Sequence, residues 1–263
     1  MTTLDDIPVN VDVELMRFNP IPESKAFIWS NQGKNIGEWV QHLSSMFRCE
    51  CYEAIFHIFN TRLYIQSLRN TLPKLRRIAI NCLINEPNNQ EIQSIENILR
   101  AFLPDVKCVR LHRVPLLPFR NLSIHHIGMT NLRELILEPD QNLKFDDLST
   151  LNVESCTIFI TQFSVRDLNR FFKLWTKGSY PNLHSLNILV RLENASDWNT
   201  LLKGLNAEEA DNSQELVEGN KKFIIDISRG ACAQVLIQSV DMWASARIEI
   251  SKLQRSSPEI CRF

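Results

Sequence analysis

Apolar positions along this chain repeat in a unit that combines an amphipathic helix, a turn and a short strand of the pattern L-x-x-L-x-L. The clearest copy covers residues 164–188, and its strand reads Leu183-x-x-Leu186-x-Ile188. Four other strands have the same spacing, the last of them in a degenerate form: Leu75-x-x-Ile78-x-Ile80, Val106-x-x-Val109-x-Leu111, Leu132-x-x-Leu135-x-Leu137 and Val153-x-x-Cys156-x-Ile158. Units that recur at intervals of 21 to 31 residues are predicted to stack, because none of them can bury its apolar face alone.

Capping signals mark where several predicted helices begin. In three of them a polar N-cap residue is followed three positions later by an acidic one: Asn35 with Glu38, Asn88 with Glu91, and Ser164 with Asp167. The helix over residues 164–177 carries one apolar stripe, which is predicted to be core: Leu168, Phe171, Phe172 and Trp175. Asn169 and Lys173 lie off this stripe, so we expect them at the surface. Shorter helices are predicted over residues 63–72 and 198–205.

This order of elements predicts an α/β fold, a leucine-rich-repeat-like stack of helix–strand units with a parallel sheet and antiparallel C-terminal strands. Alternating apolar residues near positions 223–228, 232–239 and 247–251 are the basis for the antiparallel part. We expect four regions: an N-terminal strand and loop at 1–34, the repeat region at 35–205, an acidic loop at 206–220, and C-terminal strands with a tail at 221–263.

Residues between the inward strand positions are predicted to face the open side of the sheet. They are Arg77, Ala79, Asn81, Arg110, His112, Glu134, Ile136, Glu138, Ser185 and Asn187. Seven of them are the candidate partner-binding residues: Arg77, Asn81, Arg110, His112, Glu134, Glu138 and Asn187. Two basic positions on early strands and two acidic ones on a later strand predict a polarised surface, which would steer association more than it adds affinity. Reversing the charge of Arg110 is expected to leave folding almost unchanged.

Composition narrows the classes of function. A net charge of −1 argues against a dedicated nucleic-acid binder. The chain contains no run of 18 apolar residues, so a membrane span is not predicted. No secretory signal is visible at the N-terminus, so we expect an intracellular protein, cytoplasmic or nuclear. The seven cysteines are odd in number and irregularly spaced, which predicts reduced thiols: Cys49, Cys51, Cys82, Cys108, Cys156, Cys232 and Cys261.

Signals for catalysis, metals and cofactors are weak. The chain has no H-E-x-x-H, G-x-S-x-G, G-x-x-x-x-G-K or G-x-G-x-x-G motif. Cys108 and His112 are four apart on a predicted strand, roughly 13 Å, which is too far to share one ion. We therefore predict no catalytic residues, no metal and no cofactor. An enzyme is accordingly a less supported hypothesis than a protein that acts by binding other proteins.

One segment, residues 145–188, combines distinctive polar and apolar identities. It reads FDDLSTLNVESCTIFITQFSVRDLNRFFKLWTKGSYPNLHSLNI. Its characteristic positions are Asp146-Asp147-Leu148, Leu151-Asn152, Asp167-Leu168-Asn169, Phe172-Lys173-Leu174-Trp175, Lys177-Gly178-Ser179 and Asn182-Leu183. In these positions the segment resembles the F-box-associated domain of type 2. The helix over 36–47 and the segment Asp226-Ile227 before Arg229-Gly230 are similar to the same proteins more loosely.

The resemblance implies a non-catalytic protein-recognition module. In that family an F-box docks onto the adaptor of a cullin-based ubiquitin ligase, and the associated domain recruits the protein to be ubiquitinated. Residues 1–34 show no F-box-like helical pattern, so we expect a ligase adaptor to be a partner only if an F-box exists outside this chain. The alternative is a stand-alone interaction scaffold with no ubiquitin connection; either way the expected partner is a protein.

Overall fold

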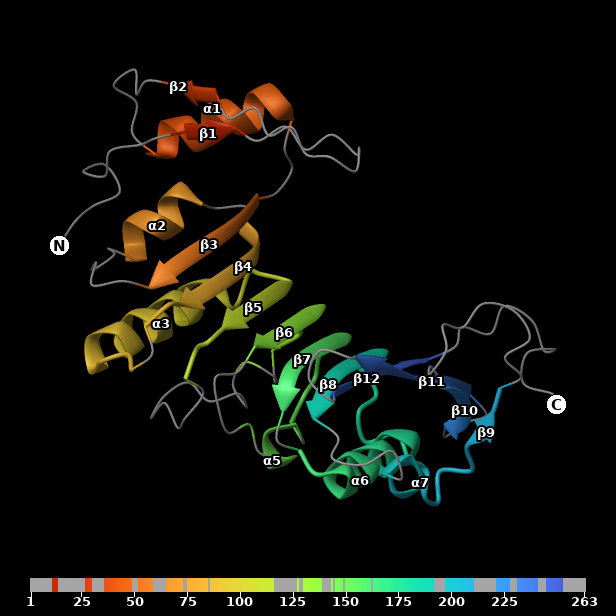
Figure 1. Cartoon of the computed structure of the whole chain (residues 1–263). Helices are drawn as coiled ribbons and strands as arrows, with labels where there is room; N and C mark the ends of the chain where they lie inside the picture. Colours follow the sequence, from red (N-terminus) through yellow and green to blue (C-terminus); the bar gives the residue numbers. More distant parts are fainter. Residues whose placement is uncertain are drawn as a thin grey trace.

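The parallel strands of the repeated unit lie side by side in one curved sheet, as the computed structural model of the chain shows (Figure 1). The structure describes residues 11–13, 27–29, 36–48, 52–58, 65–72, 75–84, 86–115, 127, 130–138, 143, 145–148, 150–161, 163–191, 197–210, 221–227, 231–240 and 245–252. Within these residues, the strands follow the order β3-β4-β5-β6-β7-β8-β12-β11-β10-β9.

Two kinds of strand pairing divide the sheet. The parallel part consists of β3 (Tyr52–Ile58), β4 (Leu75–Cys82), β5 (Cys108–His112), β6 (Glu134–Glu138), β7 (Ser155–Thr161) and β8 (Ser185–Arg191). The antiparallel part consists of β12 (Ser245–Lys252), β11 (Ala231–Val240), β10 (Lys221–Ile227) and β9 (Glu208–Glu209). A separate antiparallel pair is formed by β1 (Val11–Val13) and β2 (Phe27–Trp29). The predicted α/β class, parallel sheet and antiparallel C-terminal strands are therefore confirmed.

Helices cover one side of the parallel strands, and Figure 1 shows the opposite side of the sheet facing the hollow of the curve. The helices on this side are α2 (Ile65–Thr71), α3 (Asn89–Phe102), α5 (Phe145–Leu148), α6 (Val165–Thr176) and α7 (Asp197–Leu202), whereas α1 (Ile36–Phe47) is drawn beside β1 and β2 in Figure 1. Asn88 with Glu91 and Ser164 with Asp167 form the predicted capping boxes, which satisfy backbone N–H groups that the first turn leaves unpaired. Asn35 lies outside the described residues.

Equivalent apolar positions of successive units stack in register. In the ladder, Ile78 pairs with Val109, Val109 with Leu135, Leu135 with Cys156, and Cys156 with Leu186. Each of these side chains is at most 1 % exposed. A column of this kind gives each unit an apolar neighbour on both sides, as expected for units that cannot bury their apolar faces alone.

The helix α6 is attached to the sheet through its apolar stripe. Trp175 is 1 % exposed, and its indole Nε1–H donates a hydrogen bond of 3.0 Å to the backbone carbonyl of Leu183, just before β8. Phe171 stacks on Tyr180 with ring centroids 4.6 Å apart. Both contacts hold the end of α6 against the turn that leads into the next strand.

Asn169 does not have the surface role predicted for it. Its side-chain amide donates to the backbone carbonyls of Leu201 at 2.6 Å and Lys203 at 3.0 Å. These carbonyls belong to the end of α7, where helical C=O groups lack partners within the helix. Asn169 therefore joins α6 to α7, which is a structural role.

The region predicted as an acidic loop begins with ordered backbone. Glu208–Glu209 form β9 and pair with β10 at the edge of the sheet, while residues 211–220 lie outside the described residues. The pairing extends the sheet further than the sequence pattern indicates, because two glutamates carry no apolar alternation that would predict a strand.

The cysteines differ from one another in state. Cys82, Cys108 and Cys156 are not disulfide-bonded, and burial raises the pKa of the Cys156 thiol to about 12, so it remains protonated in the core. Cys232 is disulfide-bonded, so the prediction that every cysteine is reduced is wrong at this position. The intracellular location expected from the sequence remains a prediction.

Candidate protein-recognition surface

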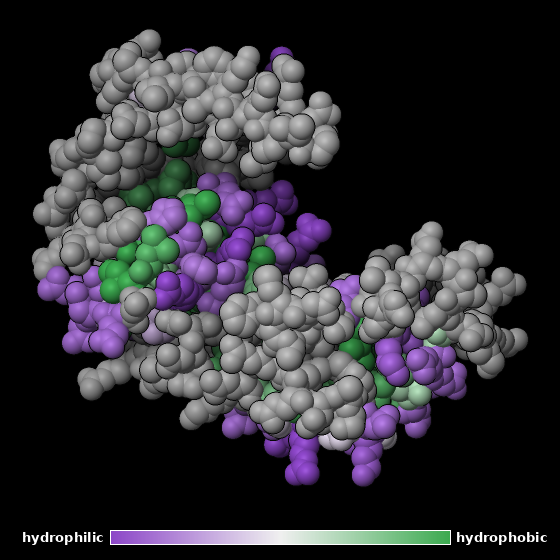
Figure 2. Space-filling model, viewed as in Figure 1, coloured by the Kyte–Doolittle hydropathy of each residue, from purple (hydrophilic) through white to green (hydrophobic). Residues whose placement is uncertain are grey.

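The predicted partner-binding residues share the open face of the sheet, because they alternate with the buried column on each strand. The strand pairing arranges these residues and their neighbours in three rows that run across the sheet from β4 towards β8. The first is Arg77, Cys108, Glu134, Ser155 and Ser185; the second is Ala79, Arg110, Ile136, Thr157 and Asn187; the third is Asn81, His112 and Glu138. Figure 2 shows hydrophilic residues interspersed with hydrophobic ones on the hollow side of the molecule. We call this surface the open face, and its role in binding remains a prediction.

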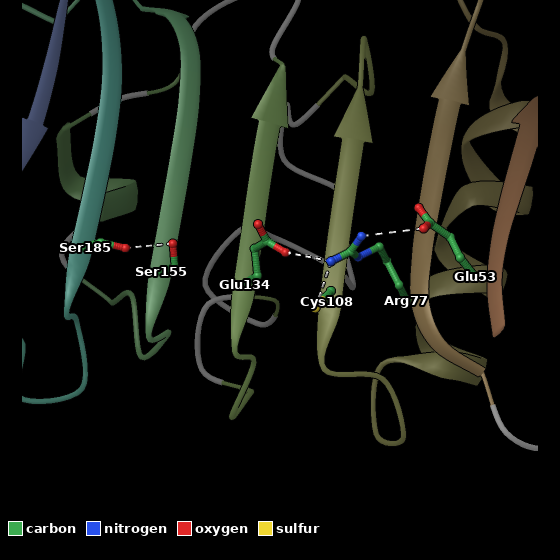
Figure 3. Close-up of polar contacts among 6 residues, drawn as sticks. All are labelled: Glu53, Arg77, Cys108, Glu134, Ser155 and Ser185. Carbon is green, nitrogen blue, oxygen red and sulfur yellow. Dashed lines mark hydrogen bonds and ion pairs between the residues drawn. The ribbon is translucent and has the colours of Figure 1, made fainter. Parts of the chain in front are cut away.

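The first row is a ladder of polar contacts that crosses the strands (Figure 3). The Arg77 guanidinium lies 3.1 Å from the Glu134 carboxylate on β6 and 3.5 Å from Glu53 on β3. It also lies 3.9 Å from the thiol sulfur of Cys108, which stands between them on β5. Further along the row, the Ser185 hydroxyl donates to that of Ser155 at 2.8 Å. The row therefore changes from charged groups on β3–β6 to neutral hydroxyls on β7 and β8.

A second charged cluster lies at the other end of the same strands. The Arg110 guanidinium donates to Glu138 through Nε at 3.0 Å and also through Nη2, and His112 Nδ1 contacts the second carboxylate oxygen. Burial acts to raise the pKa of Glu138, but the hydrogen bonds from His112 and Arg110 outweigh it and hold the pKa below the ordinary value. The carboxylate is thus kept ionised by its two neighbours.

These ion pairs correct the prediction of a polarised surface. Each arginine is neutralised by a glutamate from β6, so the open face does not separate into a basic and an acidic half. The Arg110 side chain is 50 % exposed and the Glu138 side chain only 18 %, so a partner would meet the guanidinium before the carboxylate. The sequence could not show this pairing because it depends on the register between strands.

Glu138→Gln is expected to lower the free energy of unfolding at neutral pH by about 0.5–1.5 kcal/mol, since Arg110 and His112 lose a charged acceptor. The pKa of Glu138 is lower in the folded state than in the unfolded state. The ionised carboxylate therefore contributes its full share to the free energy of unfolding above the unfolded-state pKa, and this share disappears as the pH falls through the folded-state pKa. Urea unfolding of both proteins at about pH 7 and about pH 3 checks this. If the two proteins differ as much in free energy of unfolding at about pH 3 as at about pH 7, the proposed role of the ionised Glu138 carboxylate is wrong.

Apolar side chains are interspersed in the second row. Ile55 on β3 is 56 % exposed, and Ile136 on β6 is partly exposed. Ala79, predicted to face the open side, lies between Ile55 and Arg110 in the register and is only 4 % exposed, so it offers little to a partner. The row is completed by Thr157 and Asn187, which are both partly exposed.

One set of repeated residues was not recognised from the sequence as an interacting group. An asparagine precedes the first apolar position of three successive units, at Asn131, Asn152 and Asn182. The Asn182 amide donates to Asn152 at 2.6 Å, and the Asn152 amide donates to Asn131 at 3.1 Å. The sequence signal that could have identified this group is the recurrence of asparagine at the same position of three successive units. Such recurrence favours hydrogen bonds between the asparagines of neighbouring units.

Two features are absent from the part of the chain that the structure describes: a metal-binding cluster and a membrane-spanning helix. No cluster of three or more His, Cys, Asp or Glu there could hold a metal ion. None of the helices in the same ranges is long and apolar enough to cross a membrane.

One segment of the chain that contributes strands to the open face matches a known family. Residues 123–188 match the family described as F-box associated, a segment that runs through β6, α5, β7 and α6 into β8. The match confirms the family resemblance over this segment. That family is a recognition type of domain, which supports a protein partner in general terms. No curated protein and no solved structure matches the chain.

Proposed function

We propose that this chain binds a target protein on the open face and acts as the substrate-recruiting part of an F-box ubiquitin ligase. The observation that carries the proposal is the F-box-associated match over residues 123–188, whose strands supply the centre of that face. The chain contributes no chemistry of its own. It raises the local concentration of the target near the transferring enzyme, so that a bimolecular reaction becomes effectively intramolecular.

The stacked units support this proposal through their shape. Parallel strands in register, with helices on the outer side and an asparagine ladder between units, support the proposal that the units form a leucine-rich-repeat-like array. Such arrays present an extended concave surface on which many side chains from different units act together. Polar rows with exposed apolar side chains between them match the mixed composition of non-obligate protein interfaces.

Blocking the neutral end of the open face tests the proposal. Thr157 and Asn187 are neighbours on β7 and β8, and neither is part of the charged clusters. The double variant Thr157→Arg/Asn187→Arg is expected to remove stoichiometric capture of the target while the thermal melting temperature is retained. The control is Ser179→Arg/Asn199→Arg, which adds the same charges at exposed positions near the ends of α6 and α7. Equal capture by all three proteins would show that the open face is not the binding surface.

A second measurement separates ligase recruitment from simple scaffolding. Once a target captured through the open face has been identified, its half-life in cells is compared with and without this protein. Recruitment to a ligase predicts a longer half-life when the protein is depleted, and the same lengthening when the proteasome is inhibited. An unchanged half-life would contradict the ligase role and favour the stand-alone scaffold.

A further inference from the structure

A second row of side chains, distinct from the open face, lies where the parallel strands begin. It occupies the residue after the first apolar position of three successive units: Arg76 near the start of β4, Lys107 just before β5 and Arg133 just before β6. The backbone N–H of Lys107 donates to the carbonyl of Arg76 at 2.9 Å, and the N–H of Arg133 donates to the carbonyl of Lys107 at 2.8 Å. The three residues are therefore direct neighbours across the sheet. We call them the basic rim.

The basic rim concentrates positive charge in a chain whose net charge is −1. All three side chains are exposed, and neighbouring strands are about 4.8 Å apart, so the backbone positions span roughly 10 Å. Among the residues that the structure describes, none of the three has a carboxylate within ion-pair distance.

The nearest acids in the sequence are occupied elsewhere. Glu134, next to Arg133, pairs with Arg77 on the open face at 3.1 Å. Asp105, close to Lys107, pairs with Arg69 at 3.0 Å. Among the described residues the rim side chains thus form no ion pair, although Glu154 occupies the next position after Arg133, whereas the arginines of the open face are paired with glutamates.

We propose that the basic rim binds an acidic segment of a partner protein. Three cations within about 10 Å match two or three carboxylates of an extended segment, whose same-side residues are about 6.6 Å apart. The two guanidinium groups can each hold a carboxylate through paired hydrogen bonds, and the lysine adds a point charge between them.

A peptide fits this rim better than a nucleic acid does. The positive row ends after three strands, because the equivalent positions on the next two are occupied by the exposed residues Glu154 and His184. A polynucleotide would carry its negative charge past Glu154, whereas a short acidic segment can stop before it. Nucleic-acid binding also relies on a longer basic stripe than three residues.

The inference rests on the proposed function only in taking a protein as the partner, since it uses none of the residues of the open face. It predicts two contacts by one target: a mixed polar and apolar contact on the open face, and a salt-sensitive contact on the basic rim. Contacts of the second kind act mainly on the rate of association.

The test measures binding of a labelled peptide of about ten glutamates to the full chain by fluorescence anisotropy, at low salt and at about 0.15 M salt. The triple variant Arg76→Ser/Lys107→Ser/Arg133→Ser is expected to weaken binding at least about tenfold at low salt, a change of about 1.4 kcal/mol. The matched control is Arg166→Ser/Lys177→Ser/Lys203→Ser, which removes the same charge from exposed positions on and near α6 and α7. We expect less than about a twofold change in the control.

Several outcomes would overturn the inference. If the two triple variants weaken peptide binding equally, the peptide responds to net charge alone. If a single-stranded oligonucleotide binds more tightly than the peptide and its binding depends on the rim residues, the rim belongs to a nucleic-acid site. If the triple variant does not fold, the single reversal Lys107→Glu is used, and unchanged peptide binding by it contradicts the inference. Thr157→Arg/Asn187→Arg is expected to keep the rim-dependent part of peptide binding, measured as the weakening caused by adding the rim substitutions, so failure of the basic rim and failure of the open face give different results.

Discussion

Replacing Trp175 with alanine is expected to lower the free energy of unfolding by about 3–5 kcal/mol. The indole is 1 % exposed and lies in the stripe of α6, so the change leaves a cavity between this helix and the sheet. It also removes the donor of the 3.0 Å hydrogen bond to the Leu183 carbonyl. A domain of ordinary stability, about 5–15 kcal/mol, would lose a large part of its margin.

Trp175→Phe separates these two contributions, because it keeps an aromatic ring and removes the indole N–H. Leaving the carbonyl of Leu183 without its donor is expected to cost about 1–3 kcal/mol, with a smaller loss from volume. Urea unfolding of the three proteins gives both differences. If Trp175→Ala melts like the unmodified protein, Trp175 does not belong to the core and the orientation of α6 is different.

Reversing Arg110 to glutamate is expected to lower the free energy of unfolding by about 1–3 kcal/mol. The variant removes two hydrogen bonds to Glu138 and places a second carboxylate beside it on the neighbouring strand. This value replaces the expectation from sequence alone that folding would hardly respond. Exposed ion pairs contribute only about 0–1 kcal/mol, but the Glu138 side chain is largely covered.

Arg166→Glu on the exposed surface of α6 is the matched control, since it makes the same change in charge away from the open face. Its effect on unfolding is expected to be within about 0.5 kcal/mol. Arg110→Glu should in addition slow association with a target of the open face and alter the salt dependence of that rate. A variant that folds and binds like the control would show that the Arg110–Glu138 pair contributes to neither.

Stacking of the units followed from local patterns. The spacing L-x-x-L-x-L places three inward side chains on each strand, and every one of them is buried in the structure. The capping boxes at Asn88 and Ser164 could also be predicted from the sequence, because each cap and its acidic partner are only three residues apart. The F-box-associated match falls in the segment where polar as well as apolar identities agree.

Contacts between distant residues were decided by the tertiary structure. Arg77 and Glu134 are 57 residues apart, and they meet only because β4, β5 and β6 pair in one particular register. The placement of β12 beside β8, with β10 further out, depends in the same way on long-range pairing. Asn169 looked like a surface residue because its two acceptors lie more than 30 positions further along the chain.

The sequence by itself determined the repeated unit, its inward positions and the side of each strand that stays open, because these depend on periods of two and 3.6 residues within one element. It also determined that Arg76, Lys107 and Arg133 occupy equivalent positions. Only the tertiary structure decided which charges are neutralised: the arginines of the open face meet glutamates of β6, while the basic rim meets none among the described residues. The physical reason is that an ion pair requires approach within a few ångströms, which the register between strands controls and the spacing along the chain does not.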